Sequence, residues 1–157
     1  IEQGSLREKR ALNSMRVIAG NDPTANRIID SLLLSVDSRE KQLINELAAF
    51  REGRTGTVLP VVRLPTPNHP DARKIPANVQ STEEYFSKRR NVQTSMHSLM
   101  RSETLNFVDG KRNYDSIYRA VRAEALSAGK FFYGTVEWAD VKKILDANVE
   151  SGALVLK

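Results

Sequence analysis

Residues 53–80, GRTGTVLPVVRLPTPNHPDARKIPANVQ, divide a chain whose pattern is otherwise helical. The stretch holds five of the six prolines in the 157-residue chain. Proline fixes φ and lacks a backbone N–H, so a helix cannot continue through the stretch and few positions in a sheet would accept it. The sequence therefore predicts an irregular arm over residues 54–80, between a helical unit over 1–53 and a second unit over 81–157.

The predicted arm is both basic and apolar. Four cations, Arg54, Arg63, Arg73 and Lys74, stand against one acid, Asp71, so the arm carries +3 of the chain's net charge of +5. A loop of this length without structure of its own is uncommon in a compact domain. Its apolar residues are too hydrophobic for a free linker, and we expect them to bind a partner: Val58, Leu59, Val61, Val62 and Leu64.

The N-terminal unit is predicted to contain three helices. Three helix starts carry capping signals: Ser5 with Glu8, Asp22 before Pro23, and Asp37 with Glu40. Gly20 and Gly53 stand where helices should end. Apolar residues at helical spacing follow each start, among them Met15 and Ile18, then Ile28 and Leu32, then Leu47 and Phe50. We expect these faces to form the core of a small antiparallel bundle.

The C-terminal unit is predicted to be helical with minor β content. Ser81 with Glu84 caps a helix expected over about 82–102, and further helices are expected over 115–128 and 136–149. Asp109-Gly110 is a dipeptide typical of tight hairpin turns, and short strands are expected over 131–133 and 153–156. The fold class is thus mainly α, with short strands or a hairpin.

Basic residues of this unit suggest contacts with nucleic acid. Arg90, Thr94, His97 and Arg101 recur at i, i+4, i+7 and i+11 of the helix expected over 82–102, without an intervening acid. Guanidinium groups donate paired hydrogen bonds to phosphate oxygens. The candidate nucleic-acid contacts are Arg63, Arg73, Lys74, Arg90, His97, Arg101 and, at the expected hairpin tip, Lys111 and Arg112. A solvated helix edge and an ordinary turn are the alternative interpretations.

Arg89 falls within the apolar arc of the same expected helix. A charge at such a position is costly unless it snorkels to water or is paired, so we expect one of these arrangements. A third arrangement is that this face of the helix is an interface.

No catalytic, cofactor or metal site is indicated. The chain has no cysteine and two histidines, His69 and His97, whose separation does not match a metal-ligand spacing. It contains no phosphate-binding loop, dinucleotide-binding fingerprint or nucleophile elbow. We therefore expect a non-enzymatic protein without a cofactor.

Compartment and membrane topology are constrained by the same composition. The absence of cysteine favours an intracellular reducing compartment or a virion. The longest aliphatic run, residues 32–34, is far shorter than the ~20 residues of a membrane span. The chain begins at Ile1, so we expect a processed or excised N-terminus.

These patterns predict a non-enzymatic component of a larger assembly, such as a virion, a ribosome-like particle or a multi-subunit complex. The basic arm would dock on other protein subunits, further copies of the same chain included. The alternative is a nucleic-acid-binding protein that uses the basic helix edge and the hairpin tip.

Overall fold

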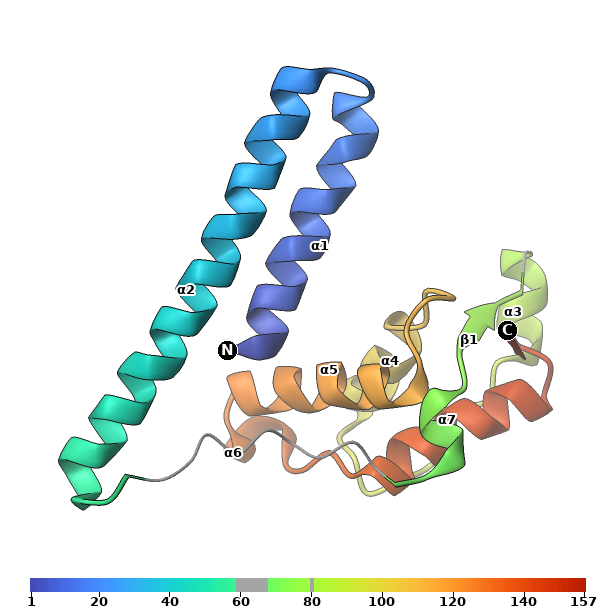
Figure 1. Cartoon of the computed structure of the whole chain (residues 1–157). Helices are drawn as coiled ribbons and strands as arrows, with labels where there is room; N and C mark the ends of the chain where they lie inside the picture. The colour runs from blue at the N-terminus through green and yellow to red at the C-terminus, as the bar shows by residue number, and fades with distance from the viewer. Residues whose placement is uncertain (59–67, 80) are drawn as a thin grey trace. The chain divides into compact units, whose positions relative to one another are not determined.

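The computed structural model describes residues 1–58, 68–79 and 81–157. Its contacts divide the chain into two compact units, Ile1–Leu64 and Pro65–Lys157. Seven α-helices and one two-stranded antiparallel sheet occur in the described part of the chain (Figure 1). The predicted class, mainly α with minor β, is confirmed.

The first unit is an antiparallel helical hairpin of α1 (Glu2–Ala19) and α2 (Pro23–Thr55) (Figure 1). The turn between them has the predicted helix-ending glycine and the predicted N-cap residue. Gly20 ends α1 with φ of 53°, and Asp22 caps α2 by accepting hydrogen bonds from the N–H groups of Thr24 (2.8 Å) and Ala25 (3.2 Å). Pro23 occupies the first helical position, where its missing N–H costs nothing.

The predicted third helix is wrong, because α2 runs without interruption through Asp37 and Glu40. Neither side chain caps a helix. Both face α1 instead: Asp37 pairs with Lys9, and the Glu40 carboxylate lies 3.6 Å from the same ammonium group. The pairing raises the pKa of Lys9.

The other glycine and capping assignments of this unit also shift. Helix α1 begins at Glu2, and Ser5 lies buried within it and does not cap its start. Gly53 lies inside α2, which ends at Gly56 in the left-handed conformation, with φ of 66°.

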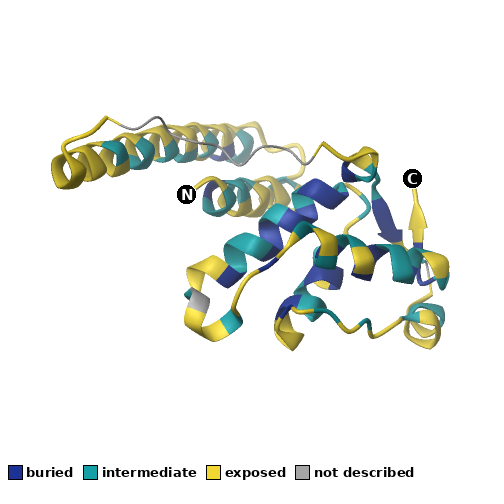
Figure 2. Ribbon diagram, turned by 90° about the horizontal axis from the view of Figure 1, so that it is seen from below, coloured by how far each residue is buried: buried dark blue, intermediate teal, exposed yellow. Residues whose placement is uncertain are grey.

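The second unit is built around three helices that pack on one another: α4 (Ser98–Asn106), α5 (Tyr114–Ser127) and α7 (Trp138–Glu150). Its smaller elements are η1 (Pro70–Arg73), β1 (Pro76–Asn78), α3 (Thr82–Lys88), α6 (Lys130–Tyr133) and β2 (Leu154–Leu156). The buried core includes Met96, Met100, Leu105, Tyr114, Ile117, Val121, Val141, Ile144 and Leu145 (Figure 2).

The described C-terminal part of the predicted arm belongs to this second unit. Strand β1 pairs antiparallel with β2, with Ala77 opposite Val155, and Ala72 of η1 is buried. Asp71 accepts from Lys74 (2.5 Å) and lies 3.1 Å from the Lys142 ammonium, and these cations lower the pKa of Asp71 to about 2. The prediction of an irregular arm outside the second unit is therefore wrong for residues 70–78, because this segment supplies the strand that pairs with the C-terminal strand. Residues 59–67 lie outside the described residues.

Three further predictions for this unit are wrong. The helix expected over 82–102 is divided into α3 and α4 by an irregular segment, residues 89–97. No hairpin surrounds Asp109-Gly110, where the Asp109 carboxylate accepts from the N–H groups of Lys111 and Arg112 in a turn between α4 and α5. Residues 131–133 lie in α6 and do not form a strand. The helices expected over 115–128 and 136–149 and the final strand are confirmed as α5, α7 and β2.

Candidate interaction surfaces

Unit 1 buries very little of its own apolar surface. Among its described residues, Ser5 and Ile29 are the buried side chains. Several large apolar side chains are exposed: Met15 (49% exposed), Ile18 (89%), Ile28 (57%), Leu32 (42%) and Phe50 (67%). Two helices share one line of contact, so a wide apolar stripe on each cannot be covered by the other.

Polar pairs between the helices define which residues lie side by side. Arg16 donates to the side chains of Asn26 (3.2 Å) and Asp30, and Lys9 pairs with Asp37. In this antiparallel register, Ile18 lies level with Ile28 and Met15 lies level with Leu32.

The helical step of 100° per residue then places these four apolar side chains on the same side of the hairpin. Phe50 lies on the same side near the end of α2, beyond the exposed ion pair of Arg39 with Glu46. We call this set, Met15, Ile18, Ile28, Leu32 and Phe50, the apolar side. The opposite side carries charged residues, among them Arg10, Arg27 and Lys41, together with the exposed apolar residues Val17 and Leu34.

The sequence placed these residues in the core of a three-helix bundle. Because no third helix exists in the described part of unit 1, the side chains expected to pack against it are exposed. The amphipathic pattern was therefore a correct signal of burial, but it does not say what covers the residues. Of the arm residues predicted to bind a partner, Val58 is exposed, and Leu59, Val61, Val62 and Leu64 lie outside the described residues.

Several of the predicted nucleic-acid contacts are engaged within unit 2. Lys74 pairs with Asp71, as described above. Arg112 donates to the Phe107 carbonyl (3.1 Å), and its guanidinium lies 4.9 Å from the centre of the Phe107 ring. His97 caps α4 through Nδ1, which accepts from the N–H of Leu99 (3.2 Å). Their positions favour a structural role.

The remaining predicted cations are differently placed. Arg73 and Lys111 are exposed, and Arg63 lies outside the described residues. Arg90 and Arg101 do not form a helical row, because Arg90 lies in the irregular segment and Arg101 in α4. Both nevertheless line one cavity of unit 2, together with Arg89, which the sequence assigned to an apolar arc.

Residues 1–58, 68–79 and 81–157 contain neither a candidate metal site nor a candidate membrane span. No group of three His, Asp or Glu side chains there could hold a metal ion. No helix there has the length and apolar character needed to cross a membrane. No family model matches the chain, and no curated protein or solved structure matches it at a significant level.

Proposed function

We propose that this protein is a non-enzymatic assembly component that associates with a second copy of itself through the apolar side of the hairpin. The observation that carries this proposal is the exposure of Met15, Ile18, Ile28, Leu32 and Phe50 along one side of two long helices.

The hairpin needs a partner for energetic reasons. Burying one large apolar side chain contributes about 1.5–3 kcal/mol, whereas ordering each residue costs about 1–2 kcal/mol of backbone entropy. With Ile29 as the buried apolar side chain among its described residues, the hairpin offsets little of that entropy by itself. Covering the apolar side would supply the missing burial.

A second copy fits the size and charge of this surface. At 1.5 Å per residue, α2 is about 50 Å long and α1 about 27 Å, so the two present a side of roughly 800 Å². Each partner contributes about 800 Å² to a standard stable interface. Residues 1–52 hold eight basic and eight acidic side chains, so no net charge selects an oppositely charged partner. Two hairpins joined in this way form a four-helix bundle with a self-complementary interface.

Sedimentation velocity of the full chain over a range of concentrations tests the proposal. The wild-type chain should sediment as a dimer. The double variant Ile18→Gln/Ile28→Gln should weaken dimerisation by 100-fold or more, since each central apolar residue contributes at least about 1–2 kcal/mol.

The matched control is Val17→Gln/Leu34→Gln. Both residues are exposed apolar positions of the same two helices, but helical spacing puts them on the opposite side. This variant should dimerise like the wild type, and far-UV circular dichroism should show equal helix content in all three proteins. A wild-type chain that stays monomeric, or a control that dissociates as fully as the test variant, would contradict the proposal. A monomer that instead pairs with a different protein would identify another occupant.

A second candidate function, nucleic-acid binding, is favoured by one observation on unit 2. Residues 85–102 contain no Asp or Glu and four basic side chains, Lys88, Arg89, Arg90 and Arg101. Binding that neutralises several phosphates should weaken steeply as salt increases. Binding that is absent at low salt, or that does not respond to salt, would remove this candidate.

A further inference from the structure

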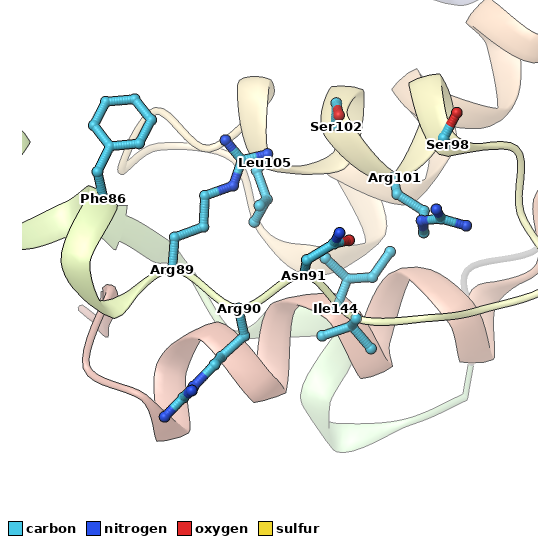
Figure 3. Close-up of a pocket in the computed structure, with 10 residues that line it drawn as sticks. Phe86, Arg89, Arg90, Asn91, Ser98, Arg101, Ser102, Leu105 and Ile144 are labelled. Carbon is cyan, nitrogen blue, oxygen red and sulfur yellow. The ribbon is translucent and has the colours of Figure 1, made fainter.

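Unit 2 contains a cavity of about 290 Å³ between the irregular segment 89–97, α4 and α7 (Figure 3). Arginine dominates its polar lining, through Arg89, Arg90 and Arg101, and Asn91, Ser98 and Ser102 add neutral hydrogen-bonding groups. None of the residues that line the cavity is acidic. Its remaining wall is apolar.

The irregular segment is held in place by helix α7. The carboxamide of Asn148, a fully buried residue, accepts from the Arg90 N–H (2.9 Å) and donates to the Arg90 carbonyl (3.3 Å). Further along, the Lys143 ammonium donates to the Gln93 carbonyl (3.1 Å). With the backbone fixed at residue 90, the Arg89 side chain points toward α4 and the Arg90 side chain points away from it (Figure 3).

Arg89 and Arg101 both line the cavity but are differently bound, and Figure 3 shows the Arg101 guanidinium pointing away from Arg89. Arg101 donates from Nη1 to the Met96 carbonyl (3.0 Å). This bond orients the guanidinium and leaves its other N–H groups available to a ligand. Arg89 is half-buried and has no carboxylate partner in the described part of the chain. Two cations on one cavity without an acid favour an anionic ligand. Phosphate is suited to such a site, because its oxygens accept paired hydrogen bonds from guanidinium groups.

The apolar wall narrows the ligand class further. Phe86 is 62% exposed and lines the cavity beside Arg89, and Leu105 and Ile144 lie deeper (Figure 3). An exposed aromatic ring is a stacking platform for a planar base. The cavity is at the small end of ligand pockets, which begin near 300 Å³, so it fits one phosphate with one attached ring system better than a larger molecule.

We propose that this cavity binds a nucleotide unit, with its phosphate against Arg89 and its base against Phe86. The unit could come from a free nucleotide or from a single-stranded nucleic acid, which share this chemistry. The site lies wholly within unit 2, so the test of this proposal does not depend on dimerisation through the hairpin.

Binding assays on the full chain at low salt test the site with three probes. They are a fluorescein-labelled oligothymidylate, adenosine monophosphate and inorganic phosphate. The variant Arg89→Gln should weaken binding of the oligonucleotide or of adenosine monophosphate by 10-fold or more. Phe86→Ala should weaken both but leave inorganic phosphate unaffected, because phosphate has no ring to stack.

The matched control is Lys157→Gln, which removes the same charge at an exposed position of unit 2 that does not line the cavity. It should change binding less than 2-fold, and thermal unfolding should show that all variants are folded. Binding of the oligonucleotide would identify the ligand as a single-stranded nucleic acid. Binding of adenosine monophosphate without binding of the oligonucleotide would identify the ligand as a free nucleotide. The proposal is overturned if no probe binds, or if Arg89→Gln and Lys157→Gln weaken binding equally. Binding of inorganic phosphate alone would overturn the role assigned to Phe86 and the base.

Discussion

Asn148 decides the path of a chain segment that lies 58 residues before it. Its carboxamide satisfies both backbone groups of Arg90 and also donates to the Ile144 carbonyl (2.8 Å) within α7. An amide side chain offers one acceptor and two donors, and these bonds use all three. The residue is fully buried, so any bond that is lost cannot be replaced freely by water.

At the scale of this residue, Asn148→Leu should destabilise unit 2 by about 1–3 kcal/mol. Leucine has a similar volume, so the loss comes from the unpaired N–H and carbonyl of Arg90 and not from a cavity. Urea unfolding, followed by circular dichroism, measures the change. The control, Asn106→Leu, alters an exposed asparagine at the end of α4 and should stay within about 0.5 kcal/mol of the wild type. An Asn148→Leu protein as stable as the control would show that the hydrogen bonds between Asn148 and the Arg90 backbone contribute little to the stability of unit 2.

At the scale of elements, the sequence pattern misplaced helix boundaries in two opposite ways. Asp37 with Glu40 resembles a capping box, yet α2 continues through it. The local sequence does indicate one continuous helix, because no glycine or proline occurs from Thr24 to Glu52 that could end a helix before Asp37. The break at residues 89–97 has no such signal. Side chains of α7 bind the backbone of this segment, and local spacing cannot reveal a contact made 58 residues away.

The candidate sites were predictable to different degrees for the same reason. Arg90 and Arg101 were identified from charge alone, but Arg89 was assigned to an apolar arc of a helix that does not exist there. The apolar residues of α1 and α2 were recognised as amphipathic stripes. Their exposure could not be foreseen, because the number of helices in the unit decides it. Composition thus identifies residues that bind or pack, whereas tertiary contacts decide where they lie.

A proline substitution distinguishes one long helix from two. If α2 is continuous, Ser38→Pro removes a backbone donor and clashes with the preceding turn, at a cost of about 3 kcal/mol or more. If a helix began after Asp37, proline at this first position would be tolerated. The control is Thr82→Pro, because Thr82 is the first residue of α3 after its Ser81 cap. Thermal unfolding should show a large loss for the first variant and little for the second. A stable Ser38→Pro protein would place a break at residue 37.

At the scale of the whole molecule, the two units differ in the chemistry that they expose. Unit 1 presents apolar side chains and unit 2 a cationic cavity, although their charges are similar: ten basic and eight acidic residues over 1–64, and fourteen and eleven over 65–157. Net charge therefore does not separate their roles. What separates them is whether the charges pair: Lys9 and Arg16 pair across the hairpin, whereas the cavity of unit 2 has no acid in its lining.

The combination of both proposals predicts avidity. A dimer carries two cavities, so a strand long enough to reach both gains an effective local concentration that a mononucleotide cannot use. Ile18→Gln/Ile28→Gln should therefore weaken binding of a long oligothymidylate by 10-fold or more while the affinity for adenosine monophosphate stays unchanged. Fluorescence anisotropy with long and short strands, at one fixed salt concentration, measures the difference. Equal losses for long strands and mononucleotide would mean that the substitutions damage the cavity. A dimeric wild type whose affinity does not rise with strand length would show that one strand does not reach both cavities.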